Sequence, residues 1–145
     1  DALAEQRPRV FADTLRMIAD FAVLGIGAGA YYAVYPGYQS LTVSGYFDYA
    51  HSDYLQFMVE LGVPATLLAG FAVLLSLYVA FRAITTRRDA LMRGVAAGAL
   101  MGIVALMIHA MVDFNFYIPA NAVTFMVVLA LPWVALHLER RRADR

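Results

Sequence analysis

The sequence predicts an all-α membrane protein with three transmembrane helices, and three observations agree on this. Of the 145 residues, 62% are hydrophobic and 15% are charged, whereas soluble domains are about 45–50% apolar and about 25% charged. Three apolar runs, at 62–84, 94–112 and 120–138, are long enough to cross a bilayer as helices. Their connections are short: a basic loop at 85–93 and a tight turn at 113–119.

Composition also excludes several classes of function. The formal net charge is zero, so no overall positive field favours binding to nucleic acid. The chain has no cysteine, which excludes disulfides and thiolate chemistry. It contains neither the HExxH spacing of zinc proteases nor the G-x-S-x-G turn of hydrolases. Because Asp1 begins in the middle of a pattern, we expect the sequence to be a piece of a longer chain.

Residues 1–61 are predicted to form a region outside the bilayer, ahead of the spans at 62–138 and a basic tail at 139–145. Residues 10–20 are expected to form an amphipathic helix, because apolar residues recur there at helical spacing. These residues are Val10, Phe11, Thr14, Leu15 and Ile18.

Residues 15–35 are ambiguous. Their hydropathy allows a spanning helix of about 20 residues, but Gly25, Gly27 and Gly29 would each weaken a helix by about 1 kcal/mol. The alternative is a helix followed by a Gly-rich loop on the membrane surface. Residues 36–50 are rich in turn formers and tyrosine, and the tyrosines favour a loop against the lipid headgroups.

The arginines predict the orientation of the spans. Cytoplasmic loops of membrane proteins carry an excess of positive charge, and the loop at 36–60 and the turn at 113–119 contain no arginine. We therefore expect His51 and the DFNFY turn to lie outside, on the same face of the membrane. The arginines lie in or beside the 85–93 loop and after the last span: Arg82, Arg87, Arg88, Arg93, Arg140, Arg141, Arg142 and Arg145.

The window at 49–66, YAHSDYLQFMVELGVPAT, is the most polar stretch between the apolar runs. If it is a helix, with about 100° between residues, its side chains divide between two faces. The packing face carries His51, Leu55, Met58 and Gly62. The opposite face carries Asp53, Gln56 and Glu60, and we expect its carboxylates to be solvated. A histidine on a packing face is either hydrogen-bonded there or functional, and the residues alone leave both open.

A second polar group is predicted near the outer end of the span at 94–112. His109 and Asp113 are four residues apart and should share a helix face. An intramembrane histidine is a functional candidate, although a His–Asp pair more often hydrogen-bonds a neighbouring helix. Asn115 and Asn121 are expected to cap the turn and the last span.

Three separated segments together resemble the bacterial O-antigen ligase and O-antigen polymerase superfamily of inner-membrane glycosyltransferases, which includes protein O-oligosaccharyltransferases. His51, Ser52, nine residues and Gly62 follow the family's ligase motif, although its final Gly-Thr-Thr reads Ala65-Thr66-Leu67 here. Upstream, Arg7, Phe11 and the glycines at 25–29 match, with Phe11 in place of the usual Trp and Ala22 in place of the usual Pro. Downstream, VDFNFYIPAN is similar to a segment in one branch of the family.

This resemblance implies that the chain is the C-terminal part of a larger polytopic, GT-C-like bundle. The implied reaction transfers an undecaprenyl-diphosphate-linked oligo- or polysaccharide to an acceptor hydroxyl, without metal or other cofactor. The acceptor is lipid A core, a growing glycan or a protein, and the partners are membrane lipid and the rest of the polytopic chain. The implied location is the inner membrane, with the functional loop in the periplasm.

The resemblance also implies roles for individual residues. His51 would be the base, because histidine titrates in the useful range. Arg7 or Arg9 would bind the diphosphate, since a guanidinium can bind it bidentately. Apart from the resemblance, Ser52, His109, Asp113 and Asn115 are candidates for supporting the site. A further family arginine belongs to an earlier loop, so we expect this segment alone to be inactive.

Two alternatives remain from the residues themselves. The chain could be a transport or channel subunit, with His109 and Asp113 as a proton or ion relay. This alternative requires pore-lining polar residues at mid-membrane depth, and the sequence offers few, since His109 is near the end of its span. It could also be a structural membrane segment whose polar loop binds a partner, and this would be favoured if His51 were buried against Leu55 and Met58 with no cavity beside it.

Overall fold

The computed structural model describes residues 2–41, 43, 45 and 47–138, and the side chains from residue 8 onward. The basic tail at 139–145 and the side chain of Arg7 lie outside this described part. The described residues form helices and contain no strand, which confirms the predicted all-α class. The helices are α1 (Ala2–Asp20), α2 (Tyr31–Val34), α3 (Asp53–Leu61), α4 (Val63–Thr86), α5 (Ala90–His109) and α6 (Pro119–His137), with 3-10 turns η1 (Tyr35–Gly37) and η2 (Asn115–Tyr117).

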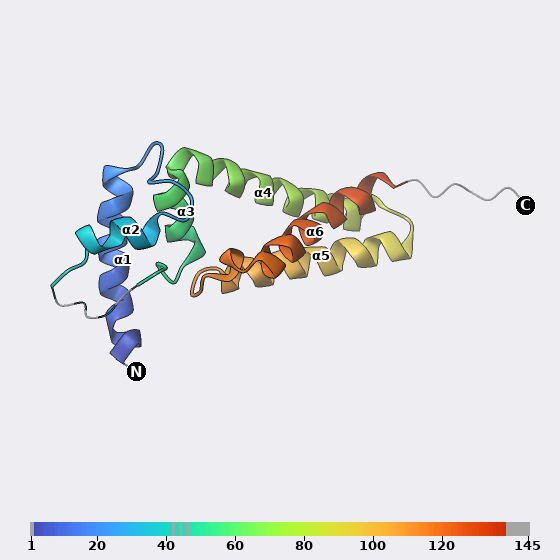
Figure 1. The fold of residues 1–145 in the computed structure, drawn as a ribbon. Coiled ribbons are helices and arrows are strands. Elements are labelled where there is room, and N and C mark those ends of the chain that lie inside the picture. Colours follow the sequence, from blue (N-terminus) through green and yellow to red (C-terminus); the bar gives the residue numbers. More distant parts are fainter. Residues whose placement is uncertain (1, 42, 44, 46, 139–145) are drawn as a thin grey trace, which may run out of the picture.

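The helices fall into two groups. Figure 1 shows α4, α5 and α6 packed together as a bundle, with α1, α2 and α3 gathered at one end of it. The connection between α5 and α6 lies at this same end, and the connection between α4 and α5 lies at the far end. The residues expected to form a site therefore converge at one end of the bundle.

Helices α4, α5 and α6 are long and apolar enough to cross a membrane, and they are the ones with this property among the described residues. They correspond to the three predicted spans. The second spanning helix, α5, starts earlier than predicted, at Ala90, because Asp89 caps it. The Asp89 Oδ1 accepts hydrogen bonds from the amides of Leu91 at 2.8 Å and Met92 at 3.3 Å, which satisfies two otherwise unpaired donors.

The ambiguous segment at 15–35 is not a spanning helix. Helix α1 ends at Asp20, and Gly25, Gly27 and Gly29 all adopt positive φ angles, of 69°, 102° and 74°. Residues with a Cβ rarely adopt this conformation, so the alternating glycines turn the chain rather than continue the helix. The expected helix followed by a Gly-rich loop is confirmed.

A small core joins α1 to the loop at 36–50 and to α3. Tyr31 and Tyr35 stack with ring centroids 5.1 Å apart, and Phe47 packs edge-on against Tyr35 at 6.1 Å. The predicted packing face of α1 is partly wrong: Val10, Thr14 and Ile18 are buried, but Leu15 is 55% exposed. The buried residues of this core include Val10, Met17, Ile18, Tyr31, Tyr35, Val43, Phe47, Ala50 and Val59.

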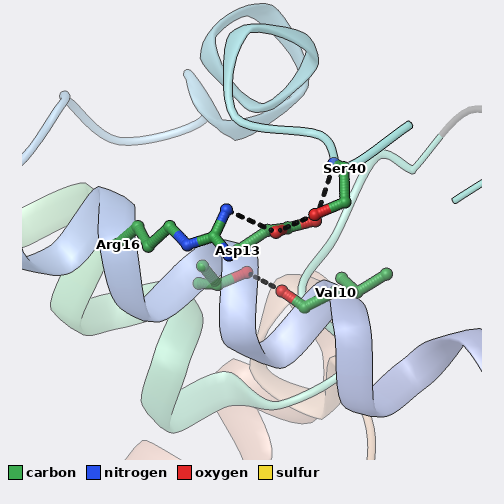
Figure 2. Close-up of polar contacts among 5 residues, drawn as sticks. Val10, Asp13, Arg16 and Ser40 are labelled. Carbon is green, nitrogen blue, oxygen red and sulfur yellow. Dashed lines mark hydrogen bonds and ion pairs between the residues drawn. The ribbon is translucent and has the colours of Figure 1, made fainter. Parts of the chain in front are cut away.

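Asp13 belongs to the buried face of α1, although it is charged. Figure 2 shows its carboxylate between Arg16 and Ser40. The Ser40 hydroxyl donates to Oδ1 at 2.6 Å and the Ser40 amide donates to Oδ2 at 3.0 Å, while the Arg16 guanidinium lies 3.4 Å from Oδ1. On the same helix the Thr14 hydroxyl donates to the Val10 carbonyl at 2.7 Å and contacts the Tyr31 hydroxyl at 2.8 Å. These bonds fasten the polar loop after α2 to α1.

Asp13→Ala is therefore expected to cost about 2–3 kcal/mol of unfolding free energy, because it leaves the Ser40 donors without their acceptor. Arg16→Ala is the matched control. The Arg16 side chain is 66% exposed, so its loss should cost about 1 kcal/mol or less. The apparent unfolding temperature of the purified protein in detergent measures both. Equal shifts for the two variants would contradict the role given to Asp13.

Candidate functional site

His51 does not lie on a helix face, contrary to the sequence prediction. Helix α3 begins at Asp53, and His51 precedes it with a φ angle of 53°, the only positive value at a non-glycine residue in the described part of the chain. This left-handed conformation is uncommon for a residue with a Cβ. Neighbouring contacts must therefore stabilise it, and such strained residues are concentrated at functional sites.

Two aromatic rings flank the half-buried His51. Its ring lies 6.2 Å from Phe47, edge-on, and 5.8 Å from Phe114. His51 therefore lies between the loop at 36–50 and the turn before α6.

The turn at 113–119 packs onto the histidine segment through further aromatic pairs. Tyr49 stacks on Phe114 with centroids 4.8 Å apart and lies 5.5 Å from Tyr117. Phe57 of α3 stacks on Tyr117 at 5.7 Å. The prediction that His51 and the DFNFY turn share one side of the bundle is confirmed by these contacts.

The face of α3 that was expected to be solvated is the buried one. Asp53, Gln56 and Glu60 are each 1% exposed. The reason is that other elements enclose α3: it contacts α1, α4 and η2, and the Gly-rich loop hydrogen-bonds to its end. Helical periodicity identifies a solvent-exposed face only when one side of the helix is not covered by other elements.

Glu60 has a full set of donors around its buried carboxylate. Its Oε1 accepts a hydrogen bond from the Gln56 amide at 2.7 Å. Its Oε2 accepts from the backbone amide of Gly29 at 2.7 Å and from the Tyr117 hydroxyl at 2.5 Å. Burial, together with this neighbouring carboxylate, raises the pKa of the Tyr117 hydroxyl far above its ordinary value, so the hydroxyl stays a donor. A buried carboxylate is tolerated when it is paired in this way.

Backbone bonds also join the Gly-rich loop to the end of α3. The Ile26 amide donates to the Val59 carbonyl at 2.9 Å, and the Gly27 amide donates to the Glu60 carbonyl at 3.0 Å. The Val63 amide returns a bond to the Ala22 carbonyl at 2.8 Å. The loop that contains the glycines at 25–29 is thus hydrogen-bonded to the end of α3 around Glu60. No contact of the described residues indicates that this loop is a phosphate-binding site.

Asp53 is the second buried carboxyl of α3. Its Oδ2 accepts from the Phe116 amide at 3.0 Å, but its Oδ1 has no hydrogen-bond partner among the described residues. Burial raises the pKa of Asp53 to about 6, against the lowering effect of the Phe116 and Asn115 amides. Asp53 lines a cavity of about 440 Å³ between α3, α4, α5 and α6, together with apolar residues such as Phe57 and Ala122.

His109 and Asp113 do lie together, as predicted, but not on one helix. Helix α5 ends at His109, and its Nε2 lies 3.8 Å from the Asp113 Oδ2, with both side chains about half exposed. This pair is at the end of the spanning helix, not at the mid-membrane depth that the transport alternative requires. Within the described residues, no three histidine, aspartate or glutamate side chains are grouped as metal ligands.

The asparagines of the turn do not act as helix caps, so that prediction is wrong. The Asn121 amide donates to the Asn115 Oδ1 at 2.6 Å, and neither α6 nor η2 has a side-chain cap. Their mutual bond closes the turn, and Asn115 is buried.

The remaining predicted site residues are less directly placed. Ser52 is buried at the start of α3, and its carbonyl accepts the Gln56 backbone amide at 3.0 Å. Arg9 lies exposed on α1, and its approach to a ligand stays a prediction. Arg7 also lies on α1, but its side chain is outside the described part.

Residues 1–70 match the family model described as O-antigen ligase. This segment is similar to the O-antigen ligase family. Searches of curated proteins and of solved structures found no match to the chain. The matched segment contains α1, the Gly-rich loop, His51, α3 and the first residues of α4. The turn with Phe114 and Tyr117, which completes the surroundings of His51, lies beyond the matched residues.

Sequence reasoning missed the buried polar network beside the segment that carries His51. Glu60 and Gln56 were assigned to solvent, and Tyr117 was not considered. One signal could have indicated that Glu60 is buried. It lies two residues before Gly62, in a short helix that joins two buried regions, and such a helix has no free side on which a carboxylate can be solvated.

Proposed function

We propose that the protein transfers a glycan from a lipid diphosphate to an acceptor hydroxyl, with His51 as the base. The match of residues 1–70 to the O-antigen ligase family supports transfer of this general type. The observation that carries the assignment to His51 is its conformation: a half-buried imidazole with a φ angle of 53°, placed between two aromatic rings. Strain of this kind is maintained where it serves a function.

In the proposed step, His51 removes the proton from the acceptor hydroxyl as its oxygen attacks the anomeric carbon of the donor sugar. A new bond forms between that oxygen and the anomeric carbon. The bond from the anomeric carbon to the diphosphate oxygen breaks, and undecaprenyl diphosphate leaves with the electron pair. A positioned general base contributes typically about 10²–10⁴-fold to such a rate.

The leaving diphosphate needs positive charge, and Arg7 and Arg9 are proposed to supply it. Both belong to α1, which contacts α3 and the 3-10 turn after α2. A guanidinium binds a diphosphate bidentately and stays charged at every relevant pH. In this proposal Ser52, His109, Asp113 and Asn115 shape the surroundings of the base.

The proposal includes the setting of the reaction. The site would lie on the periplasmic face of the bacterial inner membrane, since the arginines favour the opposite end of the bundle as the cytoplasmic one. The donor would be an undecaprenyl-diphosphate-linked glycan, and the acceptor a lipid A core, a growing glycan or a protein. The reaction would need no metal, and further charge would come from the rest of a longer polytopic chain, without which this segment is inactive.

The test is His51→Ala in cells that depend on the protein for glycan transfer. We expect transfer to fall by about 10²-fold or more. His137→Ala is the matched control, because His137 lies at the other end of α6 and stacks only on Trp133 among the described rings. Glycan profiling of the cells measures both, and loss of core attachment, of chain length or of protein glycosylation identifies the acceptor.

Transfer that survives in His51→Ala, with the variant folded and present in the membrane, would refute the base assignment. If His51→Ala abolishes glycan transfer but neither Arg7→Ala nor Arg9→Ala lowers it, the base assignment stands and the arginine assignment is refuted.

A further inference from the structure

We propose that Glu60 is a positioning residue for His51 and acts through Gln56. This inference rests on the proposed function, because it concerns the residue placed there as the base. Glu60 is buried and, among the described residues, contacts Gln56, Gly29 and Tyr117 through its carboxylate. It therefore acts on the reacting group indirectly.

The first link joins Gln56 to the residue before the base. The Ala50 amide donates to the Gln56 Oε1 at 2.8 Å, and both residues are buried. Ala50 directly precedes His51, whose φ angle of 53° is unfavourable for a residue with a Cβ. A hydrogen bond to the adjacent peptide helps to hold this conformation, so the Gln56 oxygen takes part in setting the direction of the imidazole.

The second link sets the orientation of the Gln56 side chain. A primary amide has one acceptor end and one donor end. The Glu60 carboxylate can only accept, and it takes the donor end of Gln56 at 2.7 Å. The acceptor end is thereby directed to the Ala50 amide. If Glu60 did not accept, the amide could turn over and present a donor to the Ala50 N–H.

The third link fixes Glu60 itself. Its Oε2 accepts from the Gly29 amide, in the Gly-rich loop, and from the Tyr117 hydroxyl, in the turn between α5 and α6. Tyr117 also contacts Tyr49, two residues before His51. One carboxylate thus connects the Gly-rich loop, the segment that carries the base and the last helical hairpin, and each connection is a specific contact rather than general packing.

The geometry allows an isosteric test, because the two side chains can exchange their polarity. In Glu60→Gln, the new amide can keep accepting from Gly29 and Tyr117 only by turning its donor end toward Gln56, where two donors then meet. In Gln56→Glu, two carboxylates meet with no donor between them.

The double variant, Gln56→Glu with Glu60→Gln, restores the match. The amide introduced at position 60 donates to the carboxylate introduced at position 56, and that carboxylate accepts from the Ala50 amide. The oxygen of the amide at position 60 accepts from Gly29 and Tyr117. Every bond of the natural arrangement then has a counterpart, with the polarity of the central hydrogen bond reversed.

We expect each single variant to lower glycan transfer by about 10–100-fold, the size of effect that misplacement of a catalytic group by about 1 Å produces. The double variant should recover to within about fivefold of the natural protein, which is the sign of coupling between two residues that act as a unit. In steady-state assays the single variants should lower kcat while the KM for the donor changes little, because the diphosphate contacts are untouched.

The double variant also separates positioning from the other roles Glu60 could have. If the double variant folds but stays as inactive as the singles, the carboxylate at position 60 is itself required, and the proposal is overturned. If Glu60→Gln is fully active, the proposal is overturned as well. If a single variant fails to accumulate in the membrane, the double variant decides: recovered activity supports the proposal and inactivity refutes it.

The failure of this inference differs from the failure of the proposed function. Full activity in Glu60→Gln together with no activity in His51→Ala would refute only the positioning role. Full activity in His51→Ala would refute the base assignment and this inference with it.

Tyr117→Phe gives a second measurement. It removes one donor to Glu60 but leaves Gln56 oriented by the carboxylate, so transfer should fall by less than about fivefold, well short of the loss from misplacing the base. A loss equal to that of Glu60→Gln would refute the relay through Gln56.

Discussion

Gly62→Ala is expected to destabilise strongly the association of α3 with the Gly-rich loop. Gly62 has a φ angle of 81°, and a Cβ built on it would overlap the backbone carbonyl of Val23. Both the backbone strain and the steric clash must be relieved, and the obstacle is main chain. We expect a loss of about 4 kcal/mol or more in unfolding free energy, measured as the apparent unfolding temperature and as protease resistance in detergent.

Gly27→Ala is the matched control. Gly27 also has a positive φ angle, of 102°, but a Cβ there would meet nothing within 4 Å. It should show only the cost of the backbone conformation, about 1–3 kcal/mol. Gly25→Ala should resemble Gly62→Ala, since its Cβ would overlap the Glu60 carbonyl. A Gly62→Ala protein as stable as the Gly27→Ala protein would show that the two segments do not pack as described.

Asp53→Asn is expected to remove a pH dependence of stability. Burial raises the pKa of Asp53 from 3.8 in the unfolded chain to about 6 in the fold. The folded state therefore holds its proton more tightly, and this group contributes stability that is present below about pH 4 and lost as pH rises through about 6. At neutral pH the loss is about 3 kcal/mol at most. Asparagine has no charge to bury and can still accept from the Phe116 amide.

Thermal unfolding of the two proteins, from about pH 4.5 to about pH 8, measures this difference. Asp53→Asn should be the more stable protein at the upper end of the range and should lose that advantage at the lower end. The difference between the proteins cancels the contribution of the other titrating groups. A constant difference would show that Asp53 titrates as an ordinary exposed carboxyl, and a reversed slope would mean that a cation pairs with it.

The sequence was sufficient to predict the spans because their cause is local. A run of apolar residues long enough to cross the bilayer is visible without knowledge of its neighbours, and α4, α5 and α6 match the predicted runs within a few residues. The turn at 21–30 could also be predicted from the sequence, since alternating glycines disfavour a helix wherever they occur. The remaining uncertainty at 15–35 came from hydropathy, which does not distinguish an apolar loop from a span.

The site was harder to predict because its causes are not local. Glu60 was assigned to the solvated face by helical periodicity, yet its burial follows from Gly29 and Tyr117, which are distant in sequence. The prediction that Asp53 is solvated was wrong for the same reason. His51 was placed on a helix because the window has helical spacing, but the helix begins at Asp53, where the Asp53 amide donates to the Ala110 carbonyl at 3.0 Å. No pattern within 49–66 contains these partners.

The distance along the chain between His51 and its partners has a consequence for biosynthesis. Phe114 and Tyr117 contact the histidine segment, and both are synthesised only after α4 and α5. Translation at about 5–20 residues per second therefore separates the appearance of the imidazole from that of the rings that complete its surroundings by several seconds. During that interval the nascent chain carries the histidine without its finished environment, which forms only when the last hairpin has been synthesised and has packed against the histidine segment.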